Sequence, residues 1–381
     1  MRSLIFGILV LLIGGSIGVS GVIYWQKTQI PNSLFTPDAT VVPEPERPLL
    51  AYSFPQLRQT TVKPAMISLA EEDVLKDDRY RVFTYTSDPL DRKMSGVINL
   101  PIDVSASTSA ILMLRGWVPP NQYAPGVGTK NVAAELAKAG FVTIAPDFFG
   151  YGDSDPEPTD EWQARFEKPL IAKAIIDGLR SNGIILPDST TYMPTNIGIW
   201  GHSNGGQIAL STLVAFEEEL PTSLWAPVSA PFPYSILYFS DEEEDEGQAS
   251  RKWISIFEKL YDARQFSLTN YLDGMRGPLQ IQQGTNDDAV LKWWSEEFVQ
   301  KIAKENQKRA EQVESQTALT ASASESAAIL DESATASSSS SQQPIRYTYI
   351  EYPGADHNLR PDWNEAVAKD IEFFLSNLSS N

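Results

Sequence analysis

The segment IGIWGHSNGGQIAL, residues 197–210, decides the fold of this chain. It begins with an apolar run typical of a buried strand and ends in the apolar spacing of a helix. Between the two lies GHSNGG, a Gly-x-Ser-x-Gly pattern at the junction. Small residues on both sides of Ser203 allow a sharp turn that exposes its hydroxyl, beside helix N–H groups that favour negative charge. The pattern therefore predicts Ser203 as a nucleophile.

A serine hydroxyl needs a base to accept its proton, and the chain offers two histidines, His202 and His357. Because His202 is adjacent to Ser203, we expect its side chain to point away from the serine and to pack beside the turn. His357 lies in EYPGADHN, directly after the last predicted strand. The carboxyl ends of parallel strands share one edge of a sheet, so His357 is the candidate base.

The imidazole in turn needs an orienting carboxylate, and negative charge on the substrate oxygen needs N–H donors. Asp287 and Asp288 follow the strand before His357; Asp287 is the first choice and Asp288 the alternative, since one of them could cap the next helix. The order Ser203, aspartate, His357 suits a serine hydrolase built on an α/β sheet. The candidate oxyanion donors are the backbone N–H groups of Asn204 and Trp117.

The composition of the chain excludes several functions. The 381 residues carry a net charge of −19, which argues against nucleic acid as a partner because phosphates would be repelled. There is no cysteine, which excludes disulfides and cysteine-ligated zinc, and two histidines cannot form a metal site of imidazoles. We expect no cofactor and no metal.

Strand and helix patterns alternate along most of the chain. Continuous apolar strands that alternate with helices predict an α/β fold with a mostly parallel central sheet and helices on both faces. Predicted strands lie in 82–87, 93–101, 110–116, 141–150, 196–201, 224–231, 279–284 and 347–352, and predicted helices at 131–140, 161–183 (possibly kinked at Pro169), 206–220 and 361–378.

The amino-terminal part predicts a membrane connection. Residues 4–25 are uncharged, long enough to cross a bilayer, and end in Tyr24-Trp25, as an interfacial anchor would. The alternative is a signal peptide cleaved after residue 20, which would give a secreted protein. The amino terminus and Arg2 favour an orientation in which the bulk of the chain is outside the cytoplasm, and Lys27 weakens this bias.

Three domain segments are predicted: an anchor or signal at 1–27, a Pro-rich linker and lead-in at 28–75, and a catalytic domain at 76–381. The catalytic domain contains an aromatic-rich insert at 232–276, which we expect to act as a cap. A Ser/Ala-rich stretch at 314–343 is expected to be a disordered loop.

Residues 80–380 resemble the α/β-hydrolases, in particular the catalytic domain of prolyl-oligopeptidase-like serine peptidases and related esterases. The pieces that carry the resemblance are GHSNGG, APDFFGYGDSD (145–155), GTNDD and GADHN. It implies the roles given above to Ser203, Asp287 and His357. Two features depart from these relatives. Arg115-Gly116 stands where many relatives have His-Gly, and residues 28–80 are too short for a β-propeller that gates peptide entry.

The sequence thus predicts a membrane-tethered serine hydrolase that cleaves a carboxylic ester or a peptide bond through an acyl-enzyme. The expected partners are a small-molecule ester or peptide substrate, and a membrane bound through residues 4–25. The alternative is a non-catalytic binding module on the same scaffold.

Overall fold

The computed structural model describes residues 46–105, 107–240, 244–324 and 343–378, and Arg47 onward forms one compact unit. Within the described ranges no helix is both long enough and apolar enough to span a bilayer. The anchor or signal segment predicted at 4–25 lies outside these ranges.

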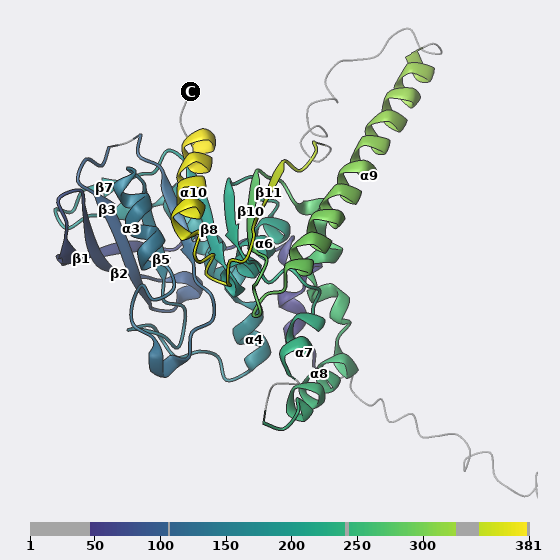
Figure 1. The fold of residues 1–381 in the computed structure, drawn as a ribbon, viewed down its shortest axis with the longest axis horizontal. Coiled ribbons are helices and arrows are strands. Elements are labelled where there is room, and N and C mark those ends of the chain that lie inside the picture. Colours follow the sequence, from purple (N-terminus) through teal and green to yellow (C-terminus); the bar gives the residue numbers. More distant parts are fainter. Residues whose placement is uncertain (1–45, 106, 241–243, 325–342, 379–381) are drawn as a thin grey trace, which may run out of the picture. The chain divides into compact units, whose positions relative to one another are not determined.

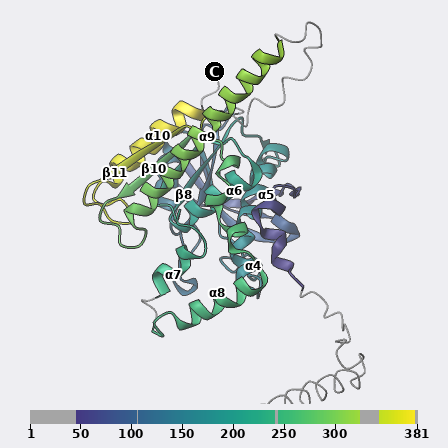
Figure 2. The same ribbon diagram turned by 90° about the vertical axis from the view of Figure 1, so that its right-hand side faces the viewer.

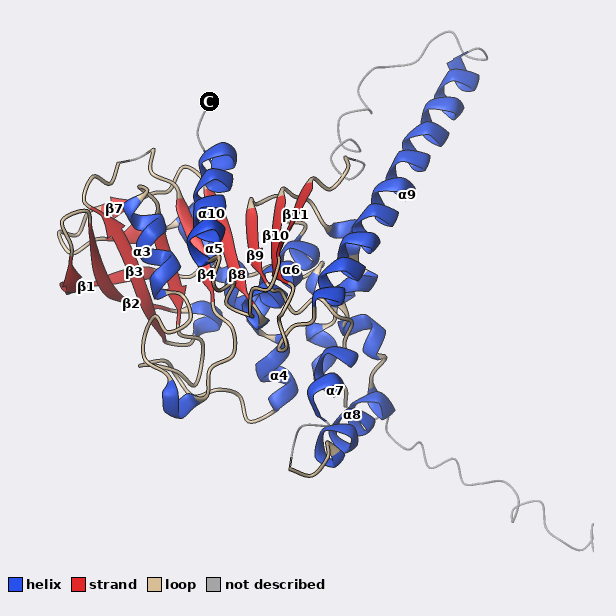
Figure 3. Ribbon diagram, viewed as in Figure 1, coloured by secondary structure: helices blue, strands red, loops and turns tan. Residues whose placement is uncertain are grey.

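A central sheet runs through this unit (Figures 1 and 3). Its strands are β1 (Ile67–Lys76), β2 (Tyr80–Ser87), β3 (Met94–Pro101), β4 (Ala110–Leu114), β5 (Val142–Pro146), β6 (Ile184–Ile185), β7 (Thr191–Tyr192), β8 (Ile197–His202), β9 (Thr222–Trp225), β10 (Leu279–Gly284) and β11 (Tyr347–Tyr352). The order is β11-β10-β9-β8-β4-β5-β3-β2-β1-β6-β7. The strands from β11 to β5 are parallel, and β3, β2 and β1 pair in antiparallel fashion. This topology confirms the predicted α/β-hydrolase fold.

Helices cover both faces of the sheet. They are α2 (Phe54–Leu57), α3 (Lys130–Lys138), α4 (Glu161–Phe166), α5 (Lys168–Ser181), α6 (Asn204–Phe216), α7 (Tyr234–Ser240), α8 (Gln248–Leu260), α9 (Lys292–Ser324) and α10 (Trp363–Leu378). Helices α2, α5, α6 and α9 contribute to the core on one face, and α3 and α10 to the core on the other. Strands β4 and β5 are buried along their whole length because both faces are covered.

Two predicted boundaries differ from the structure. Strand β1 and helix α2 lie in the segment expected to be a linker and lead-in, so the compact unit starts well before residue 76. The helix expected at 161–183 is two helices, α4 and α5, which meet at Glu167. The break lies close to the suspected kink, because Pro169 in the first turn of α5 cannot donate a helical hydrogen bond to α4.

The expected disordered loop at 314–343 is wrong for its first part, because α9 continues to Ser324. Extending an established helix adds one hydrogen bond for each residue ordered, and the alanines in this stretch favour it. Side chains from Glu311 to Thr317 are exposed, and the helix projects from the body (Figure 1). Residues 325–342 lie outside the described part of the chain.

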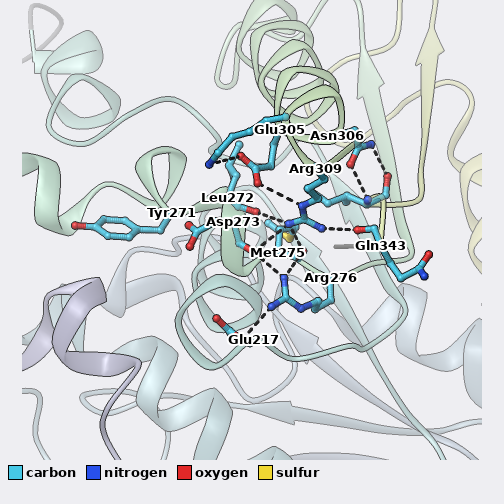
Figure 4. Close-up of polar contacts among 12 residues, drawn as sticks. Glu217, Tyr271, Leu272, Asp273, Met275, Arg276, Glu305, Asn306, Arg309 and Gln343 are labelled. Carbon is cyan, nitrogen blue, oxygen red and sulfur yellow. Dashed lines mark hydrogen bonds and ion pairs between the residues drawn. The ribbon is translucent and has the colours of Figure 1, made fainter. Parts of the chain in front are cut away.

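The insert at 232–276 contains α7, α8 and three short 3-10 helices, η5 (Ala263–Phe266), η6 (Leu268–Asn270) and η7 (Leu272–Gly274). Helix α8 lies below α4 in the turned view, and both contribute to one aromatic cluster (Figure 2). The end of the insert is fixed to α9 by the buried Arg309, whose guanidinium donates to the carbonyl oxygens of Leu272, Asp273 and Met275 (Figure 4). The insert is thus a packed part of the unit.

The last helix is joined to the sheet by a buried carboxylate, Asp370. It accepts hydrogen bonds from the indole N–H groups of Trp200 on β8 (3.0 Å) and Trp225 on β9 (2.9 Å), and from the amide of Gln282 on β10 (2.7 Å). Burial raises the pKa of Asp370 to about 7, although these donors act in the opposite direction. The contacts fix α10 across the strands that lead to the candidate site.

Candidate active site

The predicted nucleophile turn, at Ser203, lies between β8 and α6, as the sequence predicts. Ser203 has φ 56° and ψ −120°, a strained conformation for a residue with a side chain. The turn needs small neighbours: a Cβ on Gly205 would lie 1.9 Å from the carbonyl oxygen of Leu114, and one on Gly116 would lie 3.2 Å from the Cβ of Ser203. The loop after β4 therefore passes directly beside the serine.

His357 and Asp287 meet at the same edge of the sheet. The Nδ1 atom of His357 lies 2.9 Å from Oδ2 of Asp287, whose side chain is fully buried. Oδ1 of Asp287 accepts hydrogen bonds from the N–H groups of Ala289 and Val290. Asp288 is exposed, so the structure places Asp287, the first choice, against the imidazole.

Gln283 supports this pair, and the sequence analysis missed it. Its amide nitrogen donates to Oδ2 of Asp287 at 3.0 Å, and its amide oxygen accepts from the hydroxyl of Ser295 at 2.8 Å. Asp287 therefore receives hydrogen bonds at both oxygens and stays in one orientation. A signal existed: Gln283 is a polar residue in a buried strand, where its amide must find partners.

His202 packs beside the turn, as expected. Its Nε2 lies 3.0 Å from the carbonyl oxygen of His357, and the two rings are 4.6 Å apart. Burial, with a contribution from the neighbouring His357, lowers the pKa of His202 to about 4, so the ring is neutral at pH 7 and donates its Nε2–H to the carbonyl. Because His202 adjoins Ser203, this contact brings His357 to the nucleophile turn.

The candidate oxyanion donors lie on the two segments beside Ser203. Among the described residues, neither the N–H of Asn204 nor that of Trp117 has a hydrogen-bond acceptor. The buried Arg115 donates to the carbonyl oxygen of Gly116 at 3.0 Å and to that of Asp147 at 2.9 Å. The Gly116 carbonyl and the Trp117 N–H belong to one planar peptide, so Arg115 also fixes the direction of that N–H.

A pocket of about 390 Å³ opens at the serine. Ser203, Asn204 and Trp117 are among the residues that line it. Aromatic side chains line it elsewhere, from the amino-terminal segment, from α4 and from the insert: Tyr52, Phe54, Phe166, Phe232, Trp253 and Phe266. The insert therefore forms part of the pocket wall, as expected for a cap.

The chain is similar to solved structures that include esterases and peptidases. A puromycin-hydrolyzing peptidase from Mycobacterium tuberculosis is similar with a TM-score of 0.52 and 15% identity, over 81% of this chain and 41% of that one. Est1E from Butyrivibrio proteoclasticus, with ferulic acid bound, is similar with a TM-score of 0.47 and 14% identity, over 76% and 97%. The esterase Pf2001 from Pyrococcus furiosus has a TM-score of 0.47 and 15% identity, over 84% and 99%. No curated protein sequence matches the chain.

The family model of the prolyl oligopeptidase family matches residues 129–321. That range contains the nucleophile turn and Asp287, and His357 follows it. The match spans half of the chain, in agreement with the topology of the sheet and the geometry at Ser203. The chain belongs to the prolyl oligopeptidase family and is a serine hydrolase.

Proposed function

We propose that the chain cleaves carboxylic esters, or amide bonds of short peptides, through an acyl-enzyme formed on Ser203. The observation that carries this proposal is the 2.9 Å contact between the imidazole of His357 and the buried carboxylate of Asp287, next to the strained serine turn. With Nδ1–H held by Asp287, the Nε2 atom of His357 is left as a proton acceptor.

In the proposed reaction, His357 takes the proton of Ser203 as the serine oxygen attacks the substrate carbonyl. The N–H groups of Asn204 and Trp117 donate to the oxygen that becomes negative. His357 then gives the proton to the leaving group, and water repeats the steps to release the acid. The Asp287 carboxylate stabilises the imidazolium that forms.

The size of the pocket favours small substrates. About 390 Å³ lies at the low end of the range for small-molecule sites and suits a short acyl chain or a short peptide. The aromatic lining favours an apolar group beside the scissile bond. Ester and amide substrates share this mechanism, but an amide nitrogen needs more complete protonation to leave.

The experiment is labelling with a fluorophosphonate probe, with Ser203→Ala as the control. Labelling of the folded wild-type chain and its loss in the variant would support a reactive serine. Absence of labelling would favour the non-catalytic binding module. A panel of p-nitrophenyl esters and short peptide p-nitroanilides, measured in parallel, would then distinguish ester from amide hydrolysis.

We also propose that residues 4–25 tether the enzyme to a membrane, with the catalytic unit outside the cytoplasm. The support is their uncharged length and the terminal Tyr24-Trp25 pair. Membrane fractionation of the full-length protein, followed by protease treatment of intact cells, tests both statements. Release of a shortened protein into the medium would instead indicate a cleaved signal peptide.

A further inference from the structure

The pocket contains a cation that the proposed reaction does not use. Arg165 on α4 lines the pocket together with Ser203. Its Nη2 donates to the side-chain oxygen of Gln207 at 3.1 Å, a neutral partner. Within the described ranges, no carboxylate lies within ion-pair distance of this guanidinium. Its other two nitrogens are not among the buried side-chain atoms that lack a hydrogen-bond partner. Its remaining N–H groups are therefore accessible from the pocket.

The two glutamates that line the same pocket, Glu157 and Glu161, do not form ion pairs with Arg165. Glu157 lies 3.7 Å from the ammonium of Lys168. Glu161, one turn before Arg165 on α4, is exposed and forms no ion pair with it. Burial lowers the pKa of Arg165 to about 10, which still leaves it charged at neutral pH. A cation that is partly desolvated in a pocket and has no counter-ion is costly, and an anionic ligand would reduce that cost.

The guanidinium lines the same pocket as the candidate nucleophile. Gln207, which accepts its hydrogen bond, lies in the first turn of α6, four residues after Ser203, and both residues line the pocket. Ser211, one turn after Gln207 on α6, also lines the pocket. Because the pocket is only about 390 Å³, one small ligand could contact both Arg165 and Ser203.

We propose that Arg165 binds a carboxylate of the substrate, so that this hydrolase acts on esters or amides that carry a second, anionic carboxyl group a few bonds from the scissile carbonyl. The inference rests on the proposed function of Ser203. A guanidinium forms two parallel hydrogen bonds with a carboxylate, whereas a neutral carboxamide offers one acceptor and no charge. The carboxylate can belong to the acyl group, as in a hemiester of a dicarboxylic acid, or to the leaving group.

The experiment compares isosteric substrates that differ in charge. For the acyl side these are mono-p-nitrophenyl glutarate and p-nitrophenyl glutaramate; for the leaving side, the butyryl esters of 3-hydroxybenzoate and 3-hydroxybenzamide. In one of these pairs, the wild-type kcat/KM should be higher for the anion after correction for spontaneous hydrolysis. In Arg165→Gln, the ratio of anionic to neutral kcat/KM for that pair should fall 10- to 100-fold. The pair that responds identifies the side of the scissile bond.

A matched control is Arg264→Gln, which removes an arginine that is exposed on the insert and paired with Asp262. Its ratio should stay within twofold of wild type. An unchanged ratio in Arg165→Gln for both pairs would overturn the proposal. An equal loss for anionic and neutral substrates would also overturn it, because Arg165 would then bind a neutral oxygen or stabilise the wall.

Binding separates this inference from the proposed function. Calorimetric titration of Ser203→Ala with monomethyl glutarate, an anion, and methyl glutaramate, its neutral isostere, does not depend on catalysis. Tighter binding of monomethyl glutarate, lost when Arg165→Gln is added, would support the anion site even if fluorophosphonate labelling had failed. Equal binding of the two compounds, in a protein that does react with the probe, would overturn the anion site and leave the hydrolase proposal standing.

Discussion

Replacing Asp287 by Asn tests the candidate triad most directly. The asparagine oxygen can still accept from the N–H groups of Ala289 and Val290, so the loop has a reason to keep its shape. Its amide group, however, would replace Oδ2 and face two donors, Nδ1–H of His357 and the amide of Gln283. The imidazole then favours the tautomer with hydrogen on Nε2, which cannot accept the proton of Ser203.

The expected loss follows from this tautomer change. Where the orienting aspartate of such a triad is replaced by asparagine, the turnover number falls by about 10⁴-fold, or ~5.5 kcal/mol of transition-state stabilisation. We expect a decrease of 10³- to 10⁴-fold in kcat for hydrolysis of p-nitrophenyl butyrate, with KM nearly unchanged. After the tautomer change, the new amide N–H still faces the N–H of Gln283. This opposition also destabilises the fold by about 1–3 kcal/mol, which urea unfolding would measure.

The neighbouring aspartate provides the control, because Asp288→Asn removes the same charge from an exposed side chain one residue away. It should retain kcat within threefold of wild type. Retention of more than a tenth of kcat by a folded Asp287→Asn protein would refute the assignment. A large loss in Asp288→Asn, with little in Asp287→Asn, would move the role to Asp288.

Three further predictions concern residues around the site. A lysine in Arg115→Lys cannot donate to both the Gly116 and the Asp147 carbonyl oxygens. The Trp117 peptide would then be less restrained, so kcat of the folded enzyme should fall about 10- to 100-fold. An unchanged kcat would show that Arg115 does not orient the oxyanion donor. His202 has a depressed pKa of about 4, so its stabilisation is complete above pH ~6.5 and is lost as the pH falls toward 4, by about 3 kcal/mol. Urea unfolding at pH 7.5 and 4.5 should show a smaller difference for His202→Asn than for wild type, and equal differences would contradict this. Asp370→Asn should lower the free energy of unfolding by about 2–4 kcal/mol, because an amide would meet buried N–H donors, and a change below 0.5 kcal/mol would show that the cluster contributes little.

The sequence predicted the parts of the site that local patterns encode. A strand, a serine between small residues and a helix are contiguous, so the turn at Ser203 could be recognised without a structure. Asp287 and Asp288 lie in one loop, but their side chains point in different directions. These directions depend on contacts with His357, which is 70 residues away in the sequence. The choice between them was a matter of order along the chain until the structure placed Asp287 against the imidazole.

Other features arise from tertiary contacts that a linear pattern does not contain. Gln283 and Arg165 are single polar residues in a strand and a helix, and their partners lie elsewhere in space: Asp287 and Ser295 for the first, Gln207 for the second. The extension of α9 to Ser324 was missed because a Ser/Ala-rich composition resembles that of unfolded segments. Its stability as a helix comes from the packed turns before it.

The hydrogen bonds that join Asp370 to β8, β9 and β10 have a consequence for the order of events during synthesis of the chain. The tryptophans and glutamine that Asp370 joins are synthesised well before it, and 155 positions separate His202 from His357. During synthesis, the growing polypeptide therefore contains Ser203 for a long interval before His357 and Asp370 are added. Translation that stops before His357 yields a chain that has Ser203 without its candidate base and without the Asp370 contacts, so we expect such a fragment to be inactive towards esters.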